Sequence, residues 1–195
     1  MTDLAQRALA QSLVKLAQTM PVSKITIRDL TQDCGVSRST FYYHYRDIFD
    51  LVGQVVVARF GAAIGKDRGH ASWPEGLRHV MEELRRDKVF VRNVYSGVDH
   101  DKARVYLMEQ GESLMYGVAG QEAEAVGASD TAARRVAHIY AFIFVGALTE
   151  WVGDGMERDI DAVIDDLRTT LDNSFAHSLA NWMKRDASAG SRRGA

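Results

Sequence analysis

The chain has 195 residues, of which 46% are hydrophobic and 26% are charged, and its formal net charge is −2. This length accommodates one large domain or two small ones around a substantial core, so the composition excludes a disordered chain. The single cysteine, Cys34, excludes an intramolecular disulfide and a cysteine-rich metal site, and it favours a reducing compartment.

A short capped helix that ends at a glycine is predicted after a first helix over 4–19. Thr26, followed three positions later by Asp29, is a capping box, so the second helix should run over 27–34. Gly35 ends it, because glycine readily takes the left-handed conformation of a tight turn.

Another short helix, capped by Ser37, is predicted over 38–45, with Phe41 and Tyr45 on its buried side. Its outer side presents hydroxyls, an arginine and aromatic rings, the pattern of a DNA-reading helix-turn-helix. Arg38 can reach guanine edges, while phenols and imidazole donate to phosphates. The alternative is a plain helical hairpin, but a Tyr-Tyr-His-Tyr run gains little on a surface that only faces solvent.

Three motifs carry a family resemblance: Ile-Thr-Ile-Arg-Asp-Leu at 25–30, Cys-Gly-Val-Ser at 34–37 and Ser-Thr-Phe-Tyr-Tyr-His-Tyr at 39–45. With them, the stretch from Leu4 to Val52 resembles the DNA-binding domain of the TetR family of bacterial transcriptional regulators. The Phe-Val-Gly-Ala-Leu-Thr-Glu-Trp stretch at 144–151 is also similar to the regulators of dihydroxyacetone kinase operons.

The resemblance implies an all-α fold with a helix-turn-helix DNA-binding domain over 1–47 and a helical effector-binding and dimerisation domain over 48–184. A tail over 185–195, rich in Ser, Gly and Arg, is expected to be disordered. The resemblance further implies that these residues contact DNA: Thr26, Arg28, Ser37, Arg38, Ser39, Thr40, Tyr42, Tyr43 and His44.

One position departs from the family. Many members carry a lysine one residue after the equivalent of Asp47, where it contacts the DNA backbone, and this chain has Ile48. The start of the helix predicted over 48–65 can still offer backbone amides to a phosphate, but without the charge of the lysine.

The charge is unevenly distributed along the chain. Residues 24–46 contain four basic and two acidic side chains, whereas residues 150–166 contain seven acidic side chains and one arginine. The acidic segment should therefore face away from the duplex.

Beyond residue 52 the chain is expected to form helices joined by short loops, with a turn over 120–129. The predicted helices cover 75–87, 88–96, 101–118, 130–153 and 159–184.

The last two predicted helices each carry an apolar stripe at helical spacing. Paired across a twofold axis, they would form a four-helix bundle in a homodimer, as the resemblance also implies. The alternative is that both stripes only line the core of one subunit. The stripe residues expected at the dimer interface are Tyr140, Ile143, Ala147, Trp151, Ile160, Val163, Ile164, Leu167, Leu171 and Phe175.

The central helices would enclose an effector cavity if the family pattern holds. Met and aromatic residues also fill ordinary cores, which is the alternative for each of them. The residues expected to contact a small-molecule effector are Met81, Phe90, Tyr95, Tyr106, Met115, Tyr116, His138 and Phe142.

The chain contains no His pair at i, i+4, no nucleophile motif, no P-loop and no cluster of metal ligands. We therefore expect a protein that is not an enzyme and has no catalytic residues, metal or cofactor. Its expected partners are palindromic operator DNA, a second copy of the chain and an unidentified small molecule. The alternative is a regulator whose C-terminal domain binds a protein instead of a small molecule.

The N-terminus lacks the basic and apolar regions of a signal peptide. The longest uncharged run, 136–149, is shorter than the roughly 20 residues that span a bilayer. A cytoplasmic protein without a membrane segment is expected.

Overall fold

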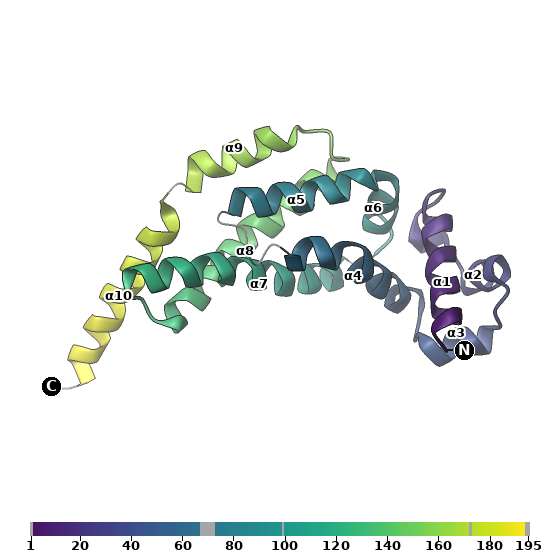
Figure 1. The fold of residues 1–195 in the computed structure, drawn as a ribbon, viewed down its shortest axis with the longest axis horizontal. Coiled ribbons are helices and arrows are strands. Elements are labelled where there is room, and N and C mark those ends of the chain that lie inside the picture. Colours follow the sequence, from purple (N-terminus) through teal and green to yellow (C-terminus); the bar gives the residue numbers. More distant parts are fainter. Residues whose placement is uncertain (1, 67–72, 99, 172, 194–195) are drawn as a thin grey trace.

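The computed structural model describes residues 2–66, 73–98, 100–171 and 173–193, and every regular element in that part of the chain is a helix. This is the all-α fold expected from the sequence. Figure 1 shows an elongated molecule with α1, α2 and α3 at one end and α10 at the other.

Helices α1 (Thr2–Ala17), α2 (Ile27–Cys34) and α3 (Arg38–His44) form a small unit, with the 3-10 turn η1 (Val22–Lys24) between α1 and α2. Each of the three helices contacts the other two. The buried centre of the unit contains Leu9, Leu13, Leu30, Phe41 and Tyr45.

Helix α4 (Ile48–Lys66) leaves this unit and packs along α5 (Trp73–Arg86), while the short α6 (Lys88–Tyr95) contacts α1 (Figure 1). One apolar cluster runs through all of these helices, so the two predicted domains share a continuous core. Besides residues of the three-helix unit, this cluster includes Leu51, Val52, Met81, Phe90, Trp151 and Ile164.

Helices α7 (His100–Val126) and α8 (Asp130–Gly153) pair along most of their length. A Cβ atom added at Gly111 would lie 2.8 Å from Val145 Cγ2, so the two backbones approach closely there. Small side chains line the seam between the helices: Ala119, Ala123, Ala132, Ala133, Ala137 and Ala141 are buried.

Helix α7 is longer than predicted. The sequence places a turn at 120–129, but the helix passes through Gly120 and ends before Gly127, whose φ is 71°. Burial of Ala119 and Ala123 against α8 outweighs the weak helix propensity of Gly120.

The single helix predicted over 159–184 is wrong, because the structure divides it into α9 (Ile160–Leu171) and α10 (Ser174–Arg193). Between them Asn173 has a φ of 57°, a left-handed conformation that asparagine tolerates better than most residues. As a result α9 packs on α5, whereas α10 packs on α7 and α8.

Helix α10 also continues through residues 185–193, where the sequence predicts a disordered tail; residues 194 and 195 lie outside the described part of the chain. The Trp182 ring lies beneath two guanidinium groups, those of Arg135 at 4.5 Å and Arg185 at 4.6 Å. The contact with Arg135 holds this part of α10 on α8, and the contact with Arg185 lies within α10 itself.

By length and composition alone, α8 could cross a membrane. Much of it is buried against α7 and α10, as in an ordinary core helix, so this feature is weak support for a membrane span.

Candidate nucleic-acid interface and internal cavity

The start of α2 is held by a reciprocal cap. The Thr26 hydroxyl oxygen accepts from the Asp29 backbone N–H at 3.2 Å, and the Asp29 carboxylate accepts from the Thr26 N–H at 2.9 Å and from its hydroxyl at 2.6 Å. Hydrogen bonds from the Thr26 side chain and backbone, with the charge of Arg28, lower the pKa of Asp29 below its ordinary value of 3.8. The predicted capping box is therefore present, and it occupies the hydroxyl that was expected to contact phosphate.

The turn between α2 and α3 is built on Gly35, which has the predicted left-handed conformation with a φ of 72°. Ser37 caps α3 by accepting from the Thr40 backbone N–H at 3.1 Å. Its Oγ also lies 2.7 Å from Ser39 Oγ and 2.8 Å from Thr40 Oγ1. Three hydroxyls thus gather at the exposed beginning of α3.

Helix α3 has one buried and one exposed side. Phe41 is fully buried and Tyr45 nearly so, and burial raises the pKa of Tyr45. Tyr42 and Tyr43 are 60% and 79% exposed, which is unusual for such large rings. Seven of the residues predicted to contact DNA are exposed (Thr26, Arg28, Ser37, Arg38, Ser39, Tyr42 and Tyr43), and Thr40 and His44 are half-buried.

The beginning of α4 is capped by two carboxylates. Asp47 Oδ1 accepts from the Asp50 N–H at 2.8 Å, and Asp50 Oδ2 accepts from the Arg46 N–H at 3.1 Å. Ile48 is half-buried and packs against the apolar core. The residue that replaces the lysine of many family members therefore contributes to packing.

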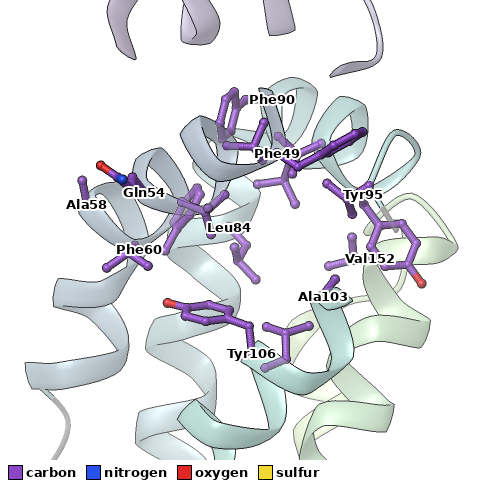
Figure 2. Close-up of a pocket in the computed structure, with 18 of the residues that line it drawn as sticks. Phe49, Gln54, Ala58, Phe60, Leu84, Phe90, Tyr95, Ala103, Tyr106 and Val152 are labelled. Atoms are coloured by element: carbon purple, nitrogen blue, oxygen red, sulfur yellow. The ribbon is translucent and has the colours of Figure 1, made fainter. Parts of the chain in front are cut away.

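A cavity of about 770 Å³ lies between α4, α6, α7 and α8. Figure 2 shows aromatic side chains from these helices around it, and the Tyr95 hydroxyl points out of it toward α8. Burial is the main cause, and the charge of Glu109 a lesser one, of a raised pKa at Tyr106.

Three of the residues predicted to contact an effector, Phe90, Tyr95 and Tyr106, line this cavity. Five do not. Met81 is fully buried in the core, Met115 lines a smaller cavity of about 80 Å³, and Tyr116 donates to the Asp130 carboxylate.

The remaining two of these residues, His138 and Phe142, are largely exposed on α8. His138 Nδ1 lies 2.8 Å from Glu112 Oε1, and the His138 and Phe142 rings meet edge to face.

Much of the cavity wall comes from α4, which the sequence predictions did not include. Apolar residues occur on nearly every side of this helix, a pattern typical of a helix that is covered on more than one face. That pattern could have indicated its role. The cavity residues of α4 are Phe49, Asp50, Val52, Gly53, Gln54, Val56, Val57, Ala58 and Phe60.

Helix α6 connects the cavity to the three-helix unit. The Asn93 side chain donates to the Ala17 carbonyl at 2.9 Å, and the Gln18 side chain donates to Asp87 Oδ1 at 2.9 Å. After α6, a Cβ atom at Gly97 would lie 2.7 Å from the Ser23 backbone nitrogen. The helix that carries Phe90 and Tyr95 is therefore fixed to the end of α1 and to η1.

Most residues predicted at a dimer interface are buried within the single chain. This applies to Tyr140, Trp151, Ile160, Val163, Ile164, Leu171 and Phe175, while Ala147 and Leu167 are half-buried. Ile143 is 36% exposed, and with Ile139 at 57% and Phe142 at 48% it forms an exposed apolar strip on α8.

The acidic segment 150–166 is partly neutralised within the molecule. Lys88 Nζ lies 2.7 Å from Glu157 Oε1, Arg78 pairs with Asp161, and Arg158 Nη2 lies 2.7 Å from Asp166 Oδ2. Two of these exposed pairs join α5 to the first turn of α9 and α6 to the segment before α9, and the third joins that segment to α9 itself.

Comparisons with known proteins agree with this architecture. Residues 71–173 match the TetR-type family model described as "Transcriptional regulator C-terminal region". A curated relative, the HTH-type dhaKLM operon transcriptional activator DhaS of Lactococcus lactis subsp. lactis (strain IL1403), is 20% identical over 112 residues. The alignment covers 57% of this chain and 59% of that relative.

Two solved structures share the fold. The dihydroxyacetone kinase operon activator DhaS has a TM-score of 0.59 at 17% identity, with 90% of this chain and 96% of that chain covered. A TetR transcriptional regulator from Streptococcus agalactiae 2603V has a TM-score of 0.59 at 18% identity, with 87% and 94% covered.

Proposed function

The chain belongs to the TetR family of transcriptional regulators, which are not enzymes, and from this premise we propose that it is a dimeric repressor released from a palindromic operator by a small molecule. The observation that carries the proposal is the exposed side of α3, where hydroxyls, the Arg38 guanidinium and two tyrosine rings face solvent. We further propose that the protein acts in the cytoplasm, where its DNA target lies.

DNA reading is assigned to α3. Arg38 would contact a guanine edge in the major groove, and Tyr42 and Tyr43 would donate to phosphates on either side. Arg28, exposed on α2, is proposed to contact the flanking backbone. Thr26 contributes by fixing the start of α2, since its hydroxyl is engaged by Asp29.

We assign dimerisation to the exposed strip of α8. Its apolar residues Ile139, Phe142 and Ile143 follow one another at helical spacing, and Gly146 extends the strip by a residue small enough for close helix approach. A twofold axis here would place two recognition helices in successive major grooves, roughly 34 to 36 Å apart.

Communication between cavity and DNA would run through α4 and α6. Helix α4 begins beside α3 and also forms much of the cavity wall, while α6 lines the cavity and bonds to α1. A ligand that binds better to one placement of these helices shifts the population toward it and changes the spacing of the recognition helices.

Selection of binding sites from a random DNA pool, followed by footprinting, tests the DNA assignment. We expect one palindromic sequence with half-sites about one helical turn apart. Binding that is the same for every sequence would contradict the proposal.

A second function is favoured by the names of two similar proteins, both called operon activators. In that case the C-terminal domain would bind a protein partner, and operator occupancy would increase transcription. Transcription in vitro with purified RNA polymerase separates the two functions: the repressor lowers transcript from an operator-bearing template, and the activator raises it.

A further inference from the structure

The large cavity is lined by rings and aliphatic side chains. Five aromatic rings contribute to it, and aliphatic residues from α4, α5, α6, α7 and α8 fill the spaces between them (Figure 2). The aromatic residues are Phe49, Phe60, Phe90, Tyr95 and Tyr106.

The charged groups at the cavity lie together at the beginning of α4. Among the described lining residues these are Arg46, Asp47 and Asp50, and the two carboxylates accept the backbone N–H groups that cap the helix. Arg46 Nε lies 3.7 Å from Asp50 Oδ2, and its side chain is 90% exposed. The Arg46 charge therefore lies mostly in solvent, and both carboxylates are engaged in capping α4.

Away from the start of α4, the described wall supplies few polar groups. The Thr149 hydroxyl donates to the Val145 and Gly146 carbonyls at 2.8 and 3.0 Å, so its proton is engaged within α8. The Tyr106 hydroxyl and the Gln54 amide are the other polar groups that this part of the wall supplies. Such a wall can serve one or two hydrogen-bonding groups of a ligand.

We propose that the effector is an uncharged hydrophobic molecule built on aromatic rings, with at most one or two polar substituents; this inference rests on the proposed function. The volume lies within the roughly 300 to 1,000 Å³ of sites that hold drug-sized ligands. A fixed charge on the ligand would lose part of its hydration against the apolar wall without gaining an ionic partner there, which is unfavourable.

The same chemistry excludes a small polyhydroxy ketone. The name of one similar solved structure refers to a dihydroxyacetone kinase operon, yet dihydroxyacetone would leave most of this apolar wall uncovered and its hydroxyls largely without partners. Regulation by dihydroxyacetone inside this cavity is therefore not expected.

The smaller cavity indicates where a substituent of the ligand would lie. It shares Leu107 and Leu148 with the large cavity, and its described lining is apolar apart from Gln110. An aliphatic substituent of the effector would extend past these two leucines toward Trp73 and Phe144.

The test uses two fluorescent probes that differ by one charged group. N-phenyl-1-naphthylamine is neutral, and 8-anilinonaphthalene-1-sulfonate carries a sulfonate on the same ring system. We expect the full-length protein to bind the neutral probe saturably, with one site per subunit, at least about tenfold more tightly than the sulfonate. Dihydroxyacetone should not displace it.

A matched pair of variants locates the site. Ala103→Trp places an indole in the cavity, and Ala187→Trp adds the same bulk on the exposed surface of α10. The first should weaken neutral-probe binding by about tenfold or more, and the second should leave it unchanged.

Each outcome bears on the inference separately from the proposed function. Equal or tighter binding of the sulfonate, displacement by dihydroxyacetone, or equal effects of the two tryptophans would overturn the ligand class, whatever the DNA experiments show. Because the comparison of the probes uses the unaltered protein, it holds even if Ala103→Trp fails to fold. Tight neutral-probe binding by a protein that selects no operator would instead remove the proposed function and leave the ligand class intact.

Discussion

Arg38 and Tyr43 both lie exposed on α3, but they carry different chemistry. A guanidinium can make two hydrogen bonds to one guanine, so it can distinguish sequences, whereas a phenol on a phosphate contacts every sequence alike. The two side chains therefore allow specificity and affinity to be separated by single substitutions.

Arg38→Ala should lower operator affinity by about 1 to 3 kcal/mol and relax the base preference at one position of each half-site. Tyr43→Phe should weaken binding to operator and to unrelated DNA by the same factor. Titrations of both variants against operator and a scrambled duplex measure this. If Arg38→Ala weakens both duplexes equally, Arg38 contacts only the backbone.

The Thr26–Asp29 cap gives a pH-dependent prediction. Because the pKa of Asp29 is lowered in the folded protein, the stabilisation due to its charge is complete above the ordinary value of 3.8 and is lost as the pH falls through the lower folded value. Asp29→Asn lacks this charge. We expect the melting temperature of the variant to lie below that of the unaltered protein at pH 7, and the gap to narrow below pH 3.8.

Comparison of the two proteins cancels the titration of every other carboxylate. A gap of the same size at pH 7 and at pH 3 would show that the charge of Asp29 contributes nothing.

Thr26, Asp29, Gly35, Ser37 and Phe41 were all predictable from sequence, since caps and left-handed turns depend on neighbours within four residues. The use of the Thr26 hydroxyl inside the cap was not foreseen.

The bounds of helices whose ends are marked by caps or glycine turns were predicted well. The bounds of helices that depend on contacts with residues distant in sequence were not. Helices α2 and α3 match their predicted bounds within a residue. The length of α7 and the break at Asn173 depend on packing against α8 and on the different neighbours of α9 and α10. The cavity residues of α4 were missed for the same reason.

The contact between Gly97 and η1 tests how firmly α6 is joined to the DNA-binding unit. In Gly97→Ala the new methyl would meet the backbone of Val22 and Ser23 at 2.9 and 2.7 Å, so it should destabilise the fold by about 1 to 3 kcal/mol. Gly117→Ala is the control, because a Cβ there meets nothing within 4 Å and should stabilise α7 by about 0.5 to 1 kcal/mol. Urea unfolding measures both.

Operator titration of the same two variants tests whether the contact between Gly97 and η1 affects DNA binding. We expect Gly97→Ala to alter operator affinity, because the DNA-binding unit must shift, and Gly117→Ala to leave it unchanged. If neither substitution affects DNA binding, the close contact at Gly97 has no part in signal transmission.

For the whole molecule, the sequence predicted a dimer interface on the helices over 130–153 and 159–184, but not which side of α8 is exposed. The helix is apolar on most sides, so periodicity could not separate the side facing α10, with Tyr140 stacked on Phe175, from the exposed strip at Ile139 and Ile143. The position of α10 in the structure is what identifies the covered side of α8.

Charging the strip should separate the subunits. Ile139→Glu combined with Ile143→Glu buries like charges across a twofold interface, so sedimentation should report a monomer with much weaker operator binding. Val89→Glu, at an equally exposed valine on α6, is the control and should remain dimeric. A double variant that still sediments as a dimer would move the interface to another surface.

The close packing of α7 against α8 limits which positions can vary among related proteins. At Gly111 a larger side chain would meet the Val145 side chain of α8, and at the buried alanines it would have to enter a packed contact, so we expect few substitutions to be tolerated at these positions. Ala103 and Tyr106, nearer the beginning of α7, line the large cavity, so substitutions there change what fits without altering the contact between α7 and α8 at Gly111. Related proteins can thus acquire new effector specificities while the contact between α7 and α8 is kept. Among them we expect more sequence variation at Ala103 and Tyr106 than at Gly111.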